Sequence, residues 1–287
     1  MTREELIHEW KNKALIMSDV DNCIIDENGK IAKETKDALT SLINVNGHAF
    51  YFGMMSYRPV LQVFGIYNSM ELRKSSYLIG NRGAEVLSMS SDQFMINLNI
   101  GALSAKRIYE ELLKIGEHNK EMSFYVTYDG VWSYLYNITK EQWGEYNIMK
   151  NLVLHDEFEA VCVIGFSISN LGKDQKDFID FAETINDVKV IIDGSNVVLV
   201  NKDVSLLNAF DYIIKRLAVA NSHVAVISKS IKDKALFMVP EVYGITSKDA
   251  DEELKQVAKL VIDKEPKDFI PEAIKCFKEY LKTVEIK

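Results

Sequence analysis

The chain has 287 residues, of which 47% are hydrophobic and 26% are charged, a composition typical of a folded protein with one large or two smaller domains. Its 34 basic and 42 acidic residues give a formal net charge of −8, which disfavours nucleic acid as a partner. The three cysteines match no zinc spacing, the charged start lacks a signal-peptide core, and the apolar runs are too short for a membrane span. We therefore expect a cytoplasmic protein with no membrane partner.

The first part of the chain alternates predicted strands and helices. Apolar runs with the length of buried strands are separated by segments with helical spacing of their apolar residues. The predicted strands are 14–18, 48–55 and 77–80, and the predicted helices are 33–44 and 59–67. The Asn28-Gly29 pair predicts a hairpin turn before the first of these helices. This rhythm is typical of a parallel sheet with helices on both faces.

Between residues 85 and 200 the pattern changes, and after residue 205 the first rhythm resumes. The predicted strands of the middle block are 94–100, 123–128, 131–138, 161–168 and 188–192, and its helices are 104–118, 174–185 and a shorter one near 141–152. The predicted elements after it are helices to 217, from 231, 251–261 and 271–284, and strands 223–227 and 242–245. The sequence therefore predicts an α/β fold, a doubly wound parallel sheet (1–84 and 201–287) with an inserted α/β cap (85–200).

Two carboxylates, Asp19 and Asp21, directly follow the first predicted strand. Side chains two positions apart on an extended chain point the same way, and parallel sheets bind ligands at the carboxyl ends of their strands. Ser56 follows the second predicted strand, where its hydroxyl and the next helix amino terminus would suit a phosphate oxygen. The residues alone leave an alternative open, in which the aspartates form turns and Ser56 caps a helix.

Several segments of the chain together resemble a known family. Residues 13–42 (KALIMSDVDNCIIDENGKIAKETKDALTSL) resemble the opening of the haloacid dehalogenase superfamily, in particular its Cof-type phosphatases, which begin with an apolar strand, Asp-x-Asp-Gly-Thr, a flap hairpin and a helix. Ser56-Tyr57-Arg58-Pro59 is similar to the family's second motif, and Asn81-Arg82-Gly83-Ala84 to its Asn-Gly-Ala turn. Residues 250–274 are similar to the closing pattern, and the inserted block matches the family's large cap in place and size.

The resemblance implies a Mg²⁺-dependent hydrolase that acts on a small phosphorylated metabolite, with a sugar phosphate as one candidate. Asp19 would be the nucleophile that forms an aspartyl-phosphate, and Asp21 would protonate the leaving group and then activate water. The implied phosphate-binding residues are Asn22, Ser56 and Arg58. The implied metal ligands are Asp19, Asp21 and Asp233.

Two parts of the family pattern are missing. The lysine expected after the cap falls on Leu206, which leaves Lys202 either to reach the phosphate or to be an exposed residue at a strand end. Lys229 stands where the family has a metal-binding aspartate. This replacement shifts the local charge by about +2, the charge of a bound magnesium ion. Lys229 could thus pair with the three aspartates and exclude the metal, unless its side chain points to solvent.

Two functional hypotheses follow. The first is a phosphatase of this family whose activity is impaired by the two missing motif residues. The second is a catalytically inactive relative that binds an anion or a partner protein. Other residues remain open. Arg82 could reach a ligand anion or be solvated, and Cys23 is expected to be a buried thiol rather than a reactive one. The aromatic residues Tyr125, Tyr128, Trp132, Tyr134 and Tyr136 alternate along two predicted strands, so one face is expected in the core of the cap, and the other either in that core or against a substrate.

Overall fold

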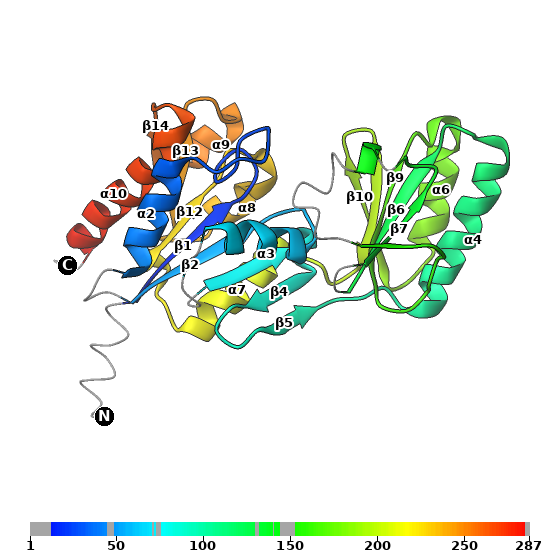
Figure 1. Ribbon diagram of the computed structural model, residues 1–287, viewed down its shortest axis with the longest axis horizontal. Helices are drawn as coiled ribbons and strands as arrows, with labels where there is room; N and C mark the ends of the chain where they lie inside the picture. The colour runs from blue at the N-terminus through cyan, green and yellow to red at the C-terminus, as the bar shows by residue number, and fades with distance from the viewer. Residues whose placement is uncertain are drawn as a thin grey trace.

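The computed structural model describes residues 13–44, 49–70, 72, 76–129, 132–139, 141–143 and 153–284. These residues form two sheets, one of eight strands and one of six, which lie in two lobes side by side (Figure 1). We call the eight-stranded sheet with its helices the core, and the six-stranded sheet with its helices the cap. No helix among the described residues has the length and apolar character needed to cross a membrane.

The core sheet has the order β14-β13-β12-β1-β2-β3-β4-β5, and the first six strands of that order pair in parallel. The parallel strands are β14 (Leu260–Ile262), β13 (Tyr243–Ser247), β12 (Val224–Ile227), β1 (Lys13–Asp19), β2 (Ala49–Met55) and β3 (Ser76–Gly80). The antiparallel edge strands are β4 (Glu85–Ser88) and β5 (Gln93–Asn97). Chain order reverses on either side of β1, which makes its carboxyl end the expected ligand site.

Helices cover both faces of the core sheet because β1 is apolar on both faces. Ala14 and Ile16 face one hydrophobic cluster, and Leu15 and Met17 face the other. The first cluster includes α2 (Lys33–Asn44), α3 (Val60–Ser69) and α10 (Pro266–Val284). The second includes α7 (Leu206–Leu217), α8 (Lys234–Phe237) and α9 (Glu252–Val257). The predicted doubly wound sheet is confirmed.

The cap sheet has the order β10-β11-β9-β6-β7-β8. Its strands are β6 (Ser123–Tyr128), β7 (Trp132–Tyr136), β8 (Val153–His155), β9 (Val163–Ser169), β10 (Val188–Asp193) and β11 (Asn196–Asn201). Its two long helices, α4 (Ala102–His118) and α6 (Gln175–Glu183), lie on the side of the sheet away from the core (Figure 1). The opposite face of the cap sheet is therefore turned toward the core (Figure 1).

Three expectations differ from the structure. Residues 85–97, expected in the cap, extend the core sheet through β4 and β5. The predicted helix 251–261 ends at Val257, because the β-branched segment that follows forms β14 and pairs with β13. The last helix begins at Pro266, five residues earlier than expected, since proline is well accommodated in a first turn. Of the short helix predicted near 141–152, only residues 141–143 are described, and they are helical.

Candidate active site

The candidate site residues lie at the carboxyl ends of adjacent parallel strands. Asp19 is the last residue of β1, Ser56 directly follows β2, and Ser228 directly follows β12. β1 pairs with both β2 and β12, so the parallel register brings these three strand ends to one edge of the sheet. The expectation from the sequence that these side chains share one crevice assumed this placement of the strand ends.

Asp19 is buried at the centre of this edge. The residue is 6% exposed, and its Oδ1 accepts a hydrogen bond from the Val20 backbone N–H at 2.8 Å. Burial raises the pKa of Asp19 well above its ordinary value, and the nearby carboxylates of Asp233 and Asp21 raise it further. This carboxyl group therefore resists ionisation unless positive charge comes close to it.

Asp21 is bound by Arg58. The guanidinium donates from Nη2 to Oδ1 at 2.7 Å and from Nε to Oδ1 at 3.0 Å and Oδ2 at 3.2 Å. Ser56 Oγ donates to Oδ2 of the same carboxylate at 3.3 Å and accepts the Arg58 backbone N–H at 3.0 Å. The second motif thus holds in place the carboxylate expected to act as acid and base.

Asp233 is 1% exposed, and both of its oxygens accept hydrogen bonds from hydroxyl groups. Ser228 Oγ donates to Oδ2 at 2.6 Å, and the Tyr57 hydroxyl donates to Oδ1 at 3.4 Å. Burial raises the pKa of Asp233 to about 6, against the lowering effect of these donors and of Lys232. Burial also raises the pKa of Tyr57, so its hydroxyl keeps its proton and remains a donor.

The carboxylates do not fit a magnesium ion as they are arranged. Both oxygens of Asp21 face Arg58, and both oxygens of Asp233 face hydroxyl donors. No group of three or more His, Cys, Asp or Glu side chains among the described residues is arranged to hold a metal. Mg²⁺ requires several oxygen ligands in near-octahedral order. Lys229 stands where the family has an aspartate that would supply one of these ligands.

The expected pairing of Lys229 with Asp19, Asp21 and Asp233 is wrong. Lys229 Nζ lies 3.1 Å from Asp249 Oδ2 and 5.1 Å from the centre of the Phe269 ring. Asp249 follows β13, the strand next to β12, and is fixed by a hydrogen bond from Ser247. A carboxylate and an aromatic face on that side hold the ammonium away from the buried aspartates.

Lys202 and Leu206 also lie away from the buried carboxylates. Lys202 is exposed just after β11, and its backbone N–H donates to Asp187 O at 3.0 Å. It is not among the residues that line the cleft described below, so its expected contact with the phosphate has no support. Leu206 begins α7 and packs against the hydrophobic cluster behind β1. Neither residue brings positive charge to Asp19.

Asn22 is exposed, and its backbone has a φ of 60°. This left-handed conformation suits the glycine of the family motif, and asparagine tolerates it better than most residues do. Cys23 is 5% exposed, and burial raises the pKa of its thiol. The expected buried and unreactive thiol is therefore consistent with the structure.

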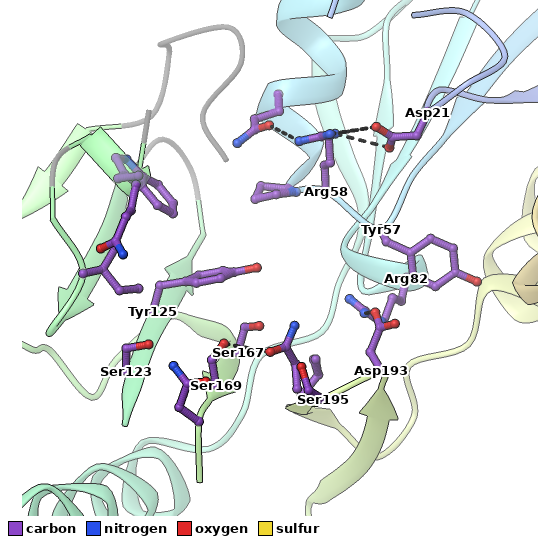
Figure 2. A pocket seen from close by; sticks show the side chains of 18 residues that line it. Asp21, Tyr57, Arg58, Arg82, Ser123, Tyr125, Ser167, Ser169, Asp193 and Ser195 are labelled. Carbon is purple, nitrogen blue, oxygen red and sulfur yellow. Dashed lines mark hydrogen bonds and ion pairs between the residues drawn. The ribbon is translucent and has the colours of Figure 1, made fainter. Parts of the chain in front are cut away.

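A cleft of about 620 Å³ lies between the core and the cap. Figure 2 shows Asp21 and Arg58 on the core side and Tyr125 opposite them on the cap side. The labelled lining residues are Asp21, Tyr57, Arg58, Arg82, Ser123, Tyr125, Ser167, Ser169, Asp193 and Ser195. Three of these come from the core turns after β1 and β2, and most of the rest carry hydroxyl groups from the cap.

The hydroxyl-rich wall follows from strand alternation in the cap sheet. Ser123 pairs with Ser169, and Tyr125 pairs with Ser167, so all four side chains lie on one face of β6 and β9. The alternate residues of the same strands, including Phe124 and Phe166, are buried in the cluster beneath the helices. The sequence reasoning missed this wall, although the serines at alternate positions of residues 167–169 were a usable signal.

Among the five aromatic residues of this region, Tyr125 lines the cleft and Trp132 is 42% exposed, whereas Tyr128, Tyr134 and Tyr136 pack in or against the hydrophobic cluster of the cap. The expectation that one face belongs to the cap core is therefore consistent with the structure. The site also contains three residues that the sequence reasoning did not propose: Tyr57, Asp193 and Lys232.

Comparison with known proteins identifies the family of this chain. A sequence model of the haloacid dehalogenase-like hydrolases matches residues 16–274. The chain belongs to this haloacid dehalogenase-like hydrolase family. No curated protein matches the sequence.

Solved structures show the same fold at low sequence identity. A haloacid dehalogenase-like hydrolase from Bacteroides thetaiotaomicron matches with a TM-score of 0.77 and 15% identity, over 92% of this chain and 99% of that one. A protein from Thermotoga maritima matches with a TM-score of 0.75 and 16% identity, over 92% and 97%. A sugar phosphatase of subclass IIB of the superfamily matches with a TM-score of 0.69 and 14% identity, over 92% and 99%. The fold is therefore the Rossmann-like fold of this superfamily with an inserted cap.

Proposed function

We propose that this family member hydrolyses a small phosphate monoester through an aspartyl-phosphate on Asp19. The observation that carries the proposal is the meeting of Asp19, Asp21, Ser56 and Asp233 at neighbouring strand ends beside a cleft. Asp21 lines that cleft, whereas Asp19, two residues earlier in the chain, is buried and is not among the lining residues. A phosphoryl group that enters beside Asp21 would meet the buried nucleophile from the open side.

The chemistry requires two steps. Asp21 first leaves Arg58 and takes up a proton from solvent. The ionised form of Asp19 then attacks phosphorus, the ester P–O bond breaks, and Asp21 gives this proton to the departing oxygen. Water then attacks the phosphorus of the aspartyl-phosphate and gives a proton back to Asp21, which releases phosphate and restores Asp19. The Arg58 guanidinium, 25% exposed at the wall of the cleft, can then donate to a phosphoryl oxygen while it keeps its contact with Gln62. No step is assigned to magnesium, because the carboxylates do not fit it.

The hydroxyl-rich wall supports a sugar phosphate as the substrate class. Ser123, Ser167 and Ser169 offer hydroxyl groups, and Tyr125 offers an aromatic face, a combination suited to a polyhydroxylated ligand. Ser167→Val should lower kcat/KM for glucose 6-phosphate about 5-fold relative to an aryl phosphate, because one hydrogen bond to the sugar is lost. An equal loss on both substrates would contradict this assignment.

A second candidate is a catalytically inactive relative that binds an anion or a partner protein. It is favoured by Leu206 at the family's lysine position and by the hydroxyl donors on both oxygens of Asp233. The first feature removes the lysine of the family motif, and the second leaves neither oxygen of Asp233 open to a metal ion.

One experiment separates the two candidates. Hydrolysis of p-nitrophenyl phosphate is measured for the wild-type protein and Asp19→Asn, each with added Mg²⁺ and with a chelator. The first candidate predicts turnover that falls to the buffer rate in Asp19→Asn. Turnover that survives this substitution would refute the first candidate. If the wild-type rate equals that of buffer on this substrate and on a panel of phosphorylated metabolites, the second candidate, a binding function, remains.

A further inference from the structure

Asp193 joins the cap to two cations of the core. It ends β10 and pairs with Asn196 across the two-residue Gly194-Ser195 turn of the β10–β11 hairpin. Its Oδ2 accepts a hydrogen bond from Arg82 Nη2, and its Oδ1 accepts one from Lys232 Nζ at 2.5 Å. A single carboxylate at the tip of a cap hairpin is thus held by two positive groups.

The two cations come from separate core turns and converge over one aromatic ring. Arg82 lies in the turn after β3, and Lys232 lies in the turn after β12. The Arg82 guanidinium is 4.8 Å and Lys232 Nζ is 5.3 Å from the centre of the Tyr57 ring. Within the described part of the chain, the ion pairs of both side chains are only with Asp193. Lys232 also acts electrostatically on the buried Asp233, with which it forms no direct ion pair, so Asp193 is the one carboxylate that both cations share directly.

Arg82 is held at this place at an energetic cost. Its backbone has φ 61° and ψ 23°, a left-handed conformation that is unfavourable for an arginine. Its side chain is only 16% exposed. Neighbouring Gly83 approaches the start of α7 so closely that an added Cβ would lie 2.5 Å from Ser205 O. The fold thus fixes a strained arginine and directs its charge to the wall of the cleft (Figure 2).

The ion pairs lie where two cavities meet. Tyr57, Arg82 and Asp193 line both the cleft and a second cavity of about 390 Å³, which Lys232 also lines. A ligand in either cavity can therefore reach the oxygen positions that Asp193 now occupies. Side chains of the second cavity, such as Ile191 and Leu206, are largely apolar, whereas the cleft is rich in hydroxyl groups.

We propose that Arg82 and Lys232 form a phosphate-binding site, separate from the buried Asp19, and that Asp193 occupies this site when no ligand is bound. A guanidinium fork binds phosphate as well as it binds carboxylate, and a phosphate group offers more oxygens to the two cations than a carboxylate does. A phosphate group near neutral pH carries about −1.5 to −2, whereas Asp193 carries −1. The ligand class is a small molecule with a phosphate group, and binding needs neither magnesium nor turnover by Asp19.

The test is isothermal titration of inorganic phosphate into the full chain in the absence of magnesium. Asp193→Asn removes the competing charge and should tighten phosphate binding at least about 10-fold. Arg82→Gln and Lys232→Gln should each weaken it about 10-fold or more. Lys232 is 47% exposed, so its variant keeps the test decisive if Arg82→Gln fails to fold. Acetate, which offers one charge and two oxygens, should bind at least about 10-fold more weakly than phosphate.

Asp249→Asn is the matched control, since it removes the carboxylate partner of Lys229 at the same edge of the sheet. Its phosphate affinity should equal that of the wild type. Unchanged or weaker binding in Asp193→Asn would overturn the proposal, as would wild-type affinity in both glutamine variants. Because the titration involves no turnover, an absence of hydrolysis would refute the proposed enzymatic function and leave this result unaffected.

Discussion

Arg58 and Asp21 form a two-pronged ion pair at the floor of the cleft, with Nη2 and Nε at 2.7 and 3.0 Å from Oδ1. Their side chains are 25% and 35% exposed, so solvent screens this pair only in part. The same carboxylate accepts the Ser56 hydroxyl. The ion pair thus links the first and second motifs and fixes Asp21 in one orientation.

A double-mutant cycle with Asp21→Asn and Arg58→Lys should measure this link. Lysine keeps the charge but cannot reproduce the guanidinium fork, and we expect a coupling of about 1 kcal/mol in the free energy of unfolding in urea. The control is the exposed pair Lys33 and Asp37, with side chains 84% and 59% exposed, whose coupling should be smaller because solvent screens both charges. A coupling at Asp21 no larger than this control would contradict the prediction.

Magnesium binding should be absent in the wild-type protein and should appear in the double variant Lys229→Asp/Tyr57→Phe. The first change supplies an oxygen ligand and shifts the local charge by about −2, and the second frees Oδ1 of Asp233 from its hydroxyl donor. Isothermal titration with MgCl₂ measures both proteins, and Tyr57→Phe alone serves as the control without binding. Binding by the wild type that is as tight as in the double variant would show that the carboxylates rearrange around the ion.

The positions of Asp19, Asp21 and Ser56 could be predicted because strand ends in a parallel sheet follow from the apolar pattern of β1 and β2. The partners of the long cationic side chains could not. Lys229 has four rotatable bonds and lies between strand ends that each offer carboxylates, so its choice of Asp249 depends on the placement of β13 and Phe269. The charge argument from the sequence was wrong about where the ammonium goes, and the loss of a metal ligand at this position stays a prediction.

The cap posed a different difficulty. Alternation along β6 and β9 separates two faces, but only the packing of α4 and α6 decides which face is covered. The extension of the core sheet by β4 and β5 was equally hidden, because short alternating strands do not reveal which sheet they join. The contact of Asp193 with Arg82 depends on how the two lobes meet, which no local pattern encodes.

Gly83→Ala should destabilise the protein by about 2–4 kcal/mol. Its φ of 95° is unfavourable for alanine, and the new Cβ would also lie 2.5 Å from the backbone oxygen of Ser205. The matched control is Gly172→Ala, at a φ of 56° with nothing within 4 Å of the added Cβ, which should cost about 1 kcal/mol. Urea denaturation of both variants isolates the steric part, and equal losses would show that the turn can move away from α7.

Glu85 should make stability depend on pH. It is 1% exposed, and its Oε2 accepts hydrogen bonds from Val60 N–H at 3.1 Å and Asn81 Nδ2 at 2.6 Å. Burial raises its pKa to about 7 from 4.5, even though these donors lower it. Because the folded protein holds this proton to higher pH than the unfolded chain does, the group's contribution to stability is complete below pH 4.5 and is lost as the pH rises through about 7.

Glu85→Gln keeps an oxygen that can accept both hydrogen bonds but cannot ionise. Relative to the wild type, its free energy of unfolding should therefore rise by roughly 2–3 kcal/mol between about pH 5 and about pH 8. Urea denaturation at both pH values measures this difference, with the exposed Glu183→Gln as a control that should show no such rise. The difference in free energy of unfolding between Glu85→Gln and the wild type could instead stay constant with pH. In that case the two donors would keep the pKa of Glu85 in the folded protein equal to its pKa in the unfolded chain, and the prediction would be wrong.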